Sequence, residues 1–127
     1  MSQPVVHFEI IGRDPAGLRA FYQALFGWEF QVADASTPTV SEPGQYGFVR
    51  GAATQNGFGI NGGVAGGPSF APHTLFYVGV PDVAAALHEA ERLGGVRQFG
   101  PEGDPGTIIV GQFTDPEGNL IGVAGPR

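Results

Sequence analysis

An internal repeat is the feature of this sequence that most constrains its fold. A shift of 68 residues aligns similar residues of the two halves: Phe8 with Phe76, Ile10 with Val78, Asp14 with Asp82, Leu25 with Leu93 and Gly27 with Gly95. In each half a strand pattern precedes the aspartate, and a helix and three further strands follow it. The repeat therefore predicts two tandem βαβββ modules, at about residues 4–64 and 72–125, within a single domain that spans residues 1–127.

The start of the first module shows the pattern most clearly. Residues 5–10 alternate as a half-buried strand does, and Asp14-Pro15 supplies a helix N-cap followed by proline at the first helical position. Gly27 then provides the helix end. The apolar positions between them have helical spacing and predict the core face of the helix: Leu18, Phe21, Tyr22, Leu25 and Phe26.

The remaining elements follow from turn residues and apolar runs. Strands are predicted at residues 28–32, 46–50, 58–61, 73–78, 96–99, 107–113 and 120–124, with an Asn56-Gly57 hairpin turn and a glycine- and proline-rich link over residues 62–72. A second helix is predicted after Asp82. Because helices do not separate every strand, this order predicts an α+β fold. We expect a curled eight-stranded sheet with both helices on its convex side, and we call its concave side the cup.

Composition excludes several classes of function. The chain has a net charge of −6, and its six cations are all arginines that are scattered along the sequence, which argues against nucleic-acid binding. Without lysine or cysteine it can form no Schiff base, disulfide or thiolate metal site. No apolar run is long enough to cross a membrane. The first four residues lack the features of a signal peptide, so we expect a cytoplasmic protein.

Three segments carry a resemblance to a known family. His7-Phe8-Glu9-Ile10, the helix end that runs from Phe21-Tyr22 to Gly27-Trp28, and the closing segment from Phe113 to Asn119 resemble the vicinal-oxygen-chelate superfamily of glyoxalases, bleomycin-resistance proteins and dioxygenases. The resemblance covers essentially the whole chain. It implies the two-module fold, a small-molecule ligand in the cup and a homodimer. It does not select a reaction, because this fold supports several chemistries.

The resemblance also implies where a metal would be held. Catalytic members of the superfamily bind a divalent metal with one side chain from the first and one from the last strand of each module, which corresponds here to His7, Asn61, Leu75 and Gly122. Only the histidine is a good ligand, and a tight site needs three or four. We therefore predict no metal and no cofactor. A shifted site that uses His7, Glu9 and His73 is the alternative.

Strand alternation sorts the side chains that should face the cup. We expect His7, Glu9 and Ile11 to share one face, and we expect Gly59 and Gly122 to leave empty volume. Trp28 either lines the cup or fills the core. The predicted ligand-binding set is His7, Glu9, Trp28, Asn61, His73, Leu75, Tyr77, Leu120 and Gly122.

Three functions are consistent with this set. The first is binding of a small, partly hydrophobic molecule in the cup without a metal, for sequestration or sensing. The second is a metal-independent isomerase, lyase or hydrolase in which His7 and Glu9 act as a catalytic acid/base pair. The third is a metal-dependent lyase or dioxygenase with the shifted site. His88, on the second helix, is expected to be a surface residue.

Overall fold

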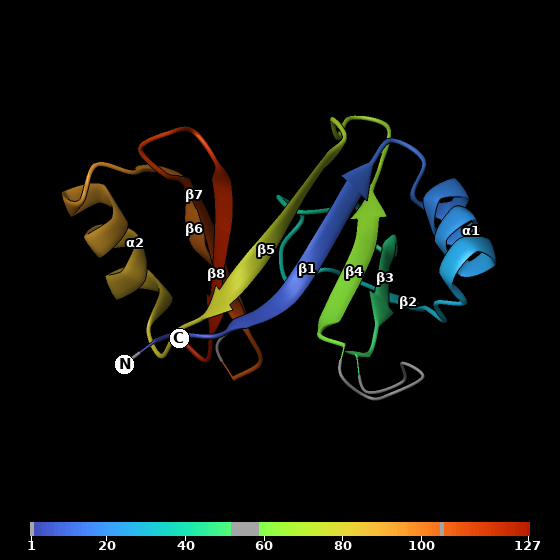
Figure 1. Ribbon diagram of the computed structural model, residues 1–127, viewed down its shortest axis with the longest axis horizontal. Helices are drawn as coiled ribbons and strands as arrows, with labels where there is room; N and C mark the ends of the chain where they lie inside the picture. Colours follow the sequence, from blue (N-terminus) through green and yellow to red (C-terminus); the bar gives the residue numbers. More distant parts are fainter. Residues whose placement is uncertain (1, 52–58, 105) are drawn as a thin grey trace. The chain divides into compact units, whose positions relative to one another are not determined.

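The computed structural model describes residues 2–51, 59–104 and 106–127 (Figure 1). The chain forms two compact units: a first unit, His7–Thr74, and a second unit, Leu75–Arg127 with the N-terminal segment up to Val6. The order of elements along the chain is β-α-β-β-β twice. The described residues therefore confirm the α+β class and the repeated βαβββ order.

The first unit holds one helix and a mixed sheet. Its elements are β1 (Val5–Gly12), α1 (Pro15–Phe26), β2 (Gln31–Ala33), β3 (Tyr46–Val49) and β4 (Asn61–Gly66). β1 runs parallel to β4, whereas β3 is antiparallel to both β4 and β2. The register places His7 beside Asn61 and Glu9 beside Gly63.

The second unit repeats this arrangement. Its elements are β5 (His73–Gly79, of which residues 75–79 belong to this unit), α2 (Val83–Arg92), β6 (Val96–Gly103), β7 (Ile109–Thr114) and β8 (Leu120–Gly125). β5 is parallel to β8, and β7 is antiparallel to both β8 and β6. Tyr77 lies beside Gly122 as Glu9 lies beside Gly63. The repeat predicted from the sequence is thus also a repeat of strand register.

Both helices begin where their sequence signals place them. Asp14 accepts a hydrogen bond from the Gly17 amide and Asp82 accepts one from the Ala85 amide, each at 3.0 Å. α1 ends at Gly27, which has a φ of +72° and donates its amide to Gln23. α1 has 12 residues and α2 has 10, and no helix among the described residues has the length and apolarity to span a membrane.

The predicted core face of α1 is only partly correct. Tyr22 stacks on Trp28 with 5.4 Å between ring centroids. The side chains of Phe21, Leu25 and Phe26 are each 57% exposed, so their assignment to the core was wrong. The cause lies in β4, which α1 packs against. This strand is composed mostly of glycine and alanine and offers little side-chain surface to cover.

β4 itself differs from its prediction. The strand was expected at residues 58–61, with residues 62–72 as a link, but it runs from Asn61 to Gly66. The Asn56-Gly57 turn and the predicted strand start at Phe58 fall in the segment 52–58, which lies outside the described residues. Glycine weakens a strand, so a segment rich in glycine is predicted to be a link. Here Gly62 lies under the ring of Phe8, where a Cβ would overlap it.

The core of the second unit forms on both faces of its sheet. α2 packs through Val83 and Leu87 onto Ile109 and Val123. β5 contributes little to this contact, because Phe76 is 40% exposed. Alternation along β5 favours Thr74 and Phe76 under this helix, but both residues are exposed. The register of β7 and β8 places their side chains there instead.

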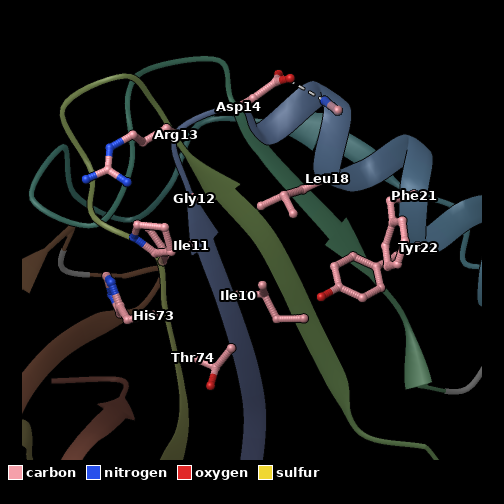
Figure 2. A pocket seen from close by; sticks show the side chains of 12 residues that line it. Ile10, Ile11, Gly12, Arg13, Asp14, Leu18, Phe21, Tyr22, His73 and Thr74 are labelled. Atoms are coloured by element: carbon pink, nitrogen blue, oxygen red, sulfur yellow. Dashed lines mark hydrogen bonds between the residues drawn. The ribbon is translucent and has the colours of Figure 1, made fainter.

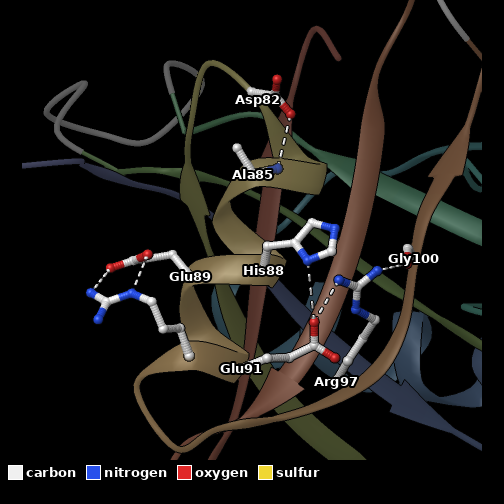
Figure 3. Close-up of polar contacts among 8 residues, drawn as sticks. Asp82, Ala85, His88, Glu89, Glu91, Arg97 and Gly100 are labelled. Atoms are coloured by element: carbon white, nitrogen blue, oxygen red, sulfur yellow. Dashed lines mark hydrogen bonds and ion pairs between the residues drawn. The ribbon is translucent and has the colours of Figure 1, made fainter.

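Polar contacts connect α2 to β6 on the surface of the second unit (Figure 3). The Glu91 carboxylate accepts a hydrogen bond from Arg97 at 2.8 Å and lies 3.8 Å from the imidazole of His88. Arg97 also donates to the Gly100 carbonyl at 3.0 Å. His88 is exposed, as the sequence predicted. Exposed pairs of this kind contribute little stability, and we assign them no further role.

Candidate functional site

A hydrogen-bonded chain of three side chains lies on one face of the first unit. Nε2 of His7 is 2.7 Å from the Tyr46 hydroxyl, and this hydroxyl donates to Oε2 of Glu9 at 2.8 Å. We call these residues the His–Tyr–Glu chain. His7 and Glu9 come from alternate positions of β1 and so share a face, as predicted. Tyr46 was not among the predicted site residues.

Strand pairing explains how Tyr46 reaches β1. Tyr46 begins β3, and β4 separates β3 from β1. The tyrosine ring crosses β4 at Gly63, where a Cβ would overlap the ring. A glycine at this position is therefore what allows a residue of β3 to bond with residues of β1.

Burial sets the protonation state of His7. It lowers the pKa of His7 from 6.5 to about 4, so the imidazole is neutral at pH 7. Its ring is stacked with those of Tyr46 and Phe48 at centroid distances of 6.2 and 5.9 Å. Because the phenol gives its single proton to Glu9, its oxygen accepts from His7. The neutral imidazole is thus the tautomer that carries its proton on Nε2.

Glu9 is almost completely buried, with 3% of its surface exposed. A carboxylate in such a place is costly unless it is hydrogen-bonded. The Tyr46 hydroxyl supplies one such bond and orients the carboxylate at the same time. The His–Tyr–Glu chain is therefore a polar group with fixed orientation. Aromatic rings surround it, because Tyr46 and Phe48 both stack on His7.

Asn61 lies next to His7 in the register of β1 and β4. Its side-chain oxygen accepts a hydrogen bond from the Gly51 amide at 3.0 Å. This hydrogen bond links Gly51, two residues after the end of β3, to the first residue of β4. The structure brings Asn61 close to the His–Tyr–Glu chain, as the sequence predicted, with its oxygen committed to the backbone.

The predicted site residues of the second unit are packed together. Leu75 and Tyr77 form a buried cluster with Val110 and Ala124, and Leu120 packs against it. Gly122 was expected to leave empty volume, but the Tyr77 ring occupies that space, and a Cβ on this glycine would overlap it. That expectation was wrong. The small residue instead accommodates the large one beside it.

Tyr77 also has a polar partner that the sequence did not reveal. Nε2 of Gln112 donates to its hydroxyl at 2.8 Å, and both side chains are buried. Gln112 lies in β7, 35 residues from Tyr77. Since only strand pairing brings these residues together, the sequence alone gave no signal for this contact.

Trp28 and His73 contact other residues of the first unit. Trp28 packs against Phe8 with 5.2 Å between centroids and against Tyr22 of α1. Phe8 alternates with His7 and Glu9, so this aromatic cluster is on the opposite face of β1. His73 starts β5, and its Nδ1 is 2.8 Å from the Ala71 carbonyl oxygen.

The residues present do not fit the metal site that the resemblance implies. Tyr77 pairs with Gly122 as Glu9 pairs with Gly63, so the position that corresponds to Asn61 is Leu120, two residues before Gly122. The four positions therefore hold His7, Asn61, Leu75 and Leu120, of which one is a good ligand. In the parts of the chain described here, no three His, Asp or Glu side chains are grouped as a metal ion requires. The same holds for the shifted site with His7, Glu9 and His73, which do not form such a group among the described residues.

Comparison with known proteins identifies the family. A family model described as "Glyoxalase-like domain" matches residues 7–124, which is nearly the whole chain. The chain belongs to this glyoxalase-like family of the vicinal-oxygen-chelate superfamily, as its motifs indicated. No curated protein sequence matches the chain.

Solved structures agree with the fold. A variant of methylmalonyl-CoA epimerase from Streptomyces coelicolor in complex with 2-nitronate-propionyl-CoA is 14% identical, with a TM-score of 0.72 and coverage of 98% of both chains. A methylmalonyl-CoA epimerase from Mycobacterium tuberculosis is 11% identical, with a TM-score of 0.63 and coverage of 97% of this chain and 87% of the other. A hypothetical protein from Bacillus halodurans is 14% identical, with a TM-score of 0.64 and coverage of 100% and 96%. At these identities the comparisons establish the fold alone. The activity has to be inferred from the residues of the site.

Proposed function

We propose that this protein binds a small, partly hydrophobic molecule at the His–Tyr–Glu chain, with no metal held by these residues. The observation that carries the proposal is the pair of hydrogen bonds, 2.7 and 2.8 Å long, that fixes a buried glutamate, a phenol and an imidazole relative to one another. Ligand sites combine an apolar surface with a few convergent polar groups of fixed orientation. The rings of Tyr46 and Phe48 supply the apolar part here.

The charges of the His–Tyr–Glu chain favour a ligand whose contacting surface is uncharged. His7 is neutral at pH 7, because burial lowers its pKa to about 4. Glu9 is held by a donor. A ligand would therefore meet a neutral imidazole and a phenol, whereas Glu9 is 3% exposed and orients the phenol by accepting its proton. This supports recognition of a hydroxyl or amide on an otherwise apolar molecule, by hydrogen bonds rather than by charge.

A second candidate is a metal-independent isomerase, lyase or hydrolase. The observation that favours it is the direction of the hydrogen bonds, which run from His7 through Tyr46 to Glu9. A proton taken up by His7 from a substrate would be balanced by transfer of the Nε2 proton to Tyr46 and of the phenol proton to Glu9. Proton transfer at carbon is also the chemistry of epimerases, which two of the similar structures are named as.

A ligand panel tests the first function and separates it from the second. We would screen methylmalonyl-CoA, propionyl-CoA and small aromatic and aliphatic alcohols and amides by thermal shift, with the wild type and with His7→Ala and Glu9→Gln. Both variants are expected to lose the shift, whereas the exposed control His88→Gln keeps it. If each variant responds as the wild type does, the site assignment is wrong.

Turnover is measured on the same ligands in D2O. Exchange of a ligand C–H for deuterium that requires both His7 and Glu9 would establish acid/base chemistry at this site. Binding without exchange supports sequestration or sensing. Exchange that survives in both variants would contradict a role for the His–Tyr–Glu chain in proton transfer.

A further inference from the structure

The outward side of α1 lacks the polar residues that a surface helix ordinarily carries there. It consists of exposed residues that helical spacing places on one side, and we call them the outer face: Ala16, Gly17, Ala20, Phe21, Ala24 and Leu25. The opposite side packs on the sheet, and Figure 2 shows Leu18 and Tyr22 extending from α1 towards β1. Phe21 and Leu25 are each 57% exposed, so the outer face presents a substantial apolar surface.

The second helix provides an internal comparison. α2 has the same place in the repeat, and its exposed residues include His88, Glu89 and Arg92. α1 has a single charged residue, Arg19, which is half-buried and donates to the Gln45 carbonyl at 2.7 Å. A polar outward side is therefore compatible with this position in the fold. The apolar outer face of α1 thus calls for a contact beyond the single chain.

We propose that the outer face of α1 binds the same face of a second copy of this chain, with the two helices antiparallel. Charge favours this occupant and this surface. Two copies that each carry a net charge of −6 repel one another, whereas the outer face brings no charged group into the contact. The inference is independent of the proposed function, because α1 contributes no residue to the His–Tyr–Glu chain.

The two ends of α1 also complement each other in this arrangement. The first turn of the helix has no acidic residue and its last turn has no basic residue, so the Asp14 cap is the one side-chain charge that offsets the helix dipole. Antiparallel pairing brings the positive end of each helix beside the negative end of the other. A second copy supplies this match by symmetry.

The order of residues along α1 suits a two-fold axis through its midpoint. The helix spans Pro15–Phe26, so the midpoint lies between Ala20 and Phe21. An axis perpendicular to the helix at this point brings the Phe21 rings of the two copies together and sets Ala24 of each copy opposite Gly17 of the other. Small residues at a contact let two helices approach closely, and paired aromatic rings supply apolar contact area.

The size of the outer face sets the strength of the contact. A helix of 12 residues is about 18 Å long. One face of such a helix is smaller than the roughly 800 Å² per partner that a standard interface buries. We therefore expect a weak dimer whose population depends on protein concentration.

Sedimentation velocity of the full chain measures this dimer at concentrations from about 1 µM to about 1 mM. We expect the average mass to rise from that of a monomer towards that of a dimer. Ala20→Glu and Ala20→Arg should each weaken dimerisation by at least about tenfold, because the two copies of this residue meet at the axis and like charges repel. An equimolar mixture of the two variants should form a dimer again, since opposite charges then meet.

Ala85→Glu is the matched control, because Ala85 is an exposed alanine of α2. This variant should dimerise as the wild type does. Recovery of the dimer in the mixture also shows that both Ala20 variants are folded. The proposal is overturned if the wild type stays monomeric over the whole range, if Ala20→Glu dimerises as the wild type does, if the mixture stays monomeric, or if Ala85→Glu weakens the dimer equally.

Discussion

At the scale of single residues, one phenol holds two ionisable side chains of β1 in place. Tyr46 accepts from His7 and donates to Glu9, so its hydroxyl serves both bonds. The sequence predicted His7 and Glu9 because strand alternation is a local property. Tyr46 could not be predicted, because it lies 37 residues from Glu9 and reaches it only across an intervening strand.

Removing this hydroxyl should destabilise the fold. Tyr46→Phe keeps the ring but takes one hydrogen-bond partner from each of two side chains, of which Glu9 is buried. We expect the free energy of unfolding to fall by about 1–3 kcal/mol, as measured by urea denaturation at pH 7. Tyr22→Phe is the matched control, since no hydrogen bond of its hydroxyl occurs in the described structure, and should change stability little. Equal effects of the two variants would contradict the assigned bonds.

The pKa of His7 predicts a dependence of stability on pH. Burial lowers it from 6.5 to about 4, so between these values the unfolded chain binds more protons than the folded one. Stability therefore rises with pH across this window and is lost as pH falls from 6.5 towards 4. The His7 contribution should reach about 3 kcal/mol.

Urea denaturation between pH 4 and 7 measures this contribution. His7→Gln should flatten the dependence, whereas His88→Gln, at an exposed histidine, should leave it unchanged. A wild-type slope that persists in His7→Gln would show that other groups cause it.

At the scale of elements, features that depend on local signals were predicted correctly, whereas features that depend on tertiary contacts were not. Helix starts were predicted correctly, because an aspartate cap acts within three residues of its own position. The position of β4 was missed, because Gly62 and Gly63 are explained only by the rings of Phe8 and Tyr46 that lie over them. The exposure of Phe21 and Leu25 has the same origin, since periodicity cannot reveal how little surface a partner strand offers.

The close approach at Gly63 can be measured by a double-mutant cycle. A Cβ at this position would overlap the Tyr46 ring, so Gly63→Ala should cost about 1–3 kcal/mol of stability. When Tyr46→Ala removes the ring, the same glycine change should cost nothing or stabilise the strand slightly. Additive effects of the two changes would mean that the ring does not lie over Gly63.

The cap of α2 provides a second test. Asp82→Ala removes the bond to the Ala85 amide and should lower the free energy of unfolding by about 1 kcal/mol. Asp82→Asn keeps an oxygen acceptor and should retain most of that stability. Thermal denaturation of the three proteins compares them directly. If asparagine is no better than alanine, then the cap does not act through this hydrogen bond.

At the scale of the whole molecule, the repeat and the family could be predicted, whereas the content of the site could not. The two modules keep the same strand register, yet one holds Glu9 beside Gly63 and the other holds Tyr77 beside Gly122. In the second unit the Tyr77 ring occupies the space over Gly122 and is part of a buried apolar cluster. The polar site is thus confined to the first unit. The single domain, the homodimer and the cytoplasmic location stay predictions.

The most direct test of the account is to locate ligand binding on metal-free protein. The strongest ligand of the panel would be titrated into EDTA-treated protein while amide chemical shifts are followed by NMR. The account predicts saturable shifts centred on His7, Glu9 and Tyr46, with an affinity that added Zn²⁺, Ni²⁺ or Mn²⁺ does not change. Binding that appears only with added metal, or shifts that avoid all three residues, would contradict the account.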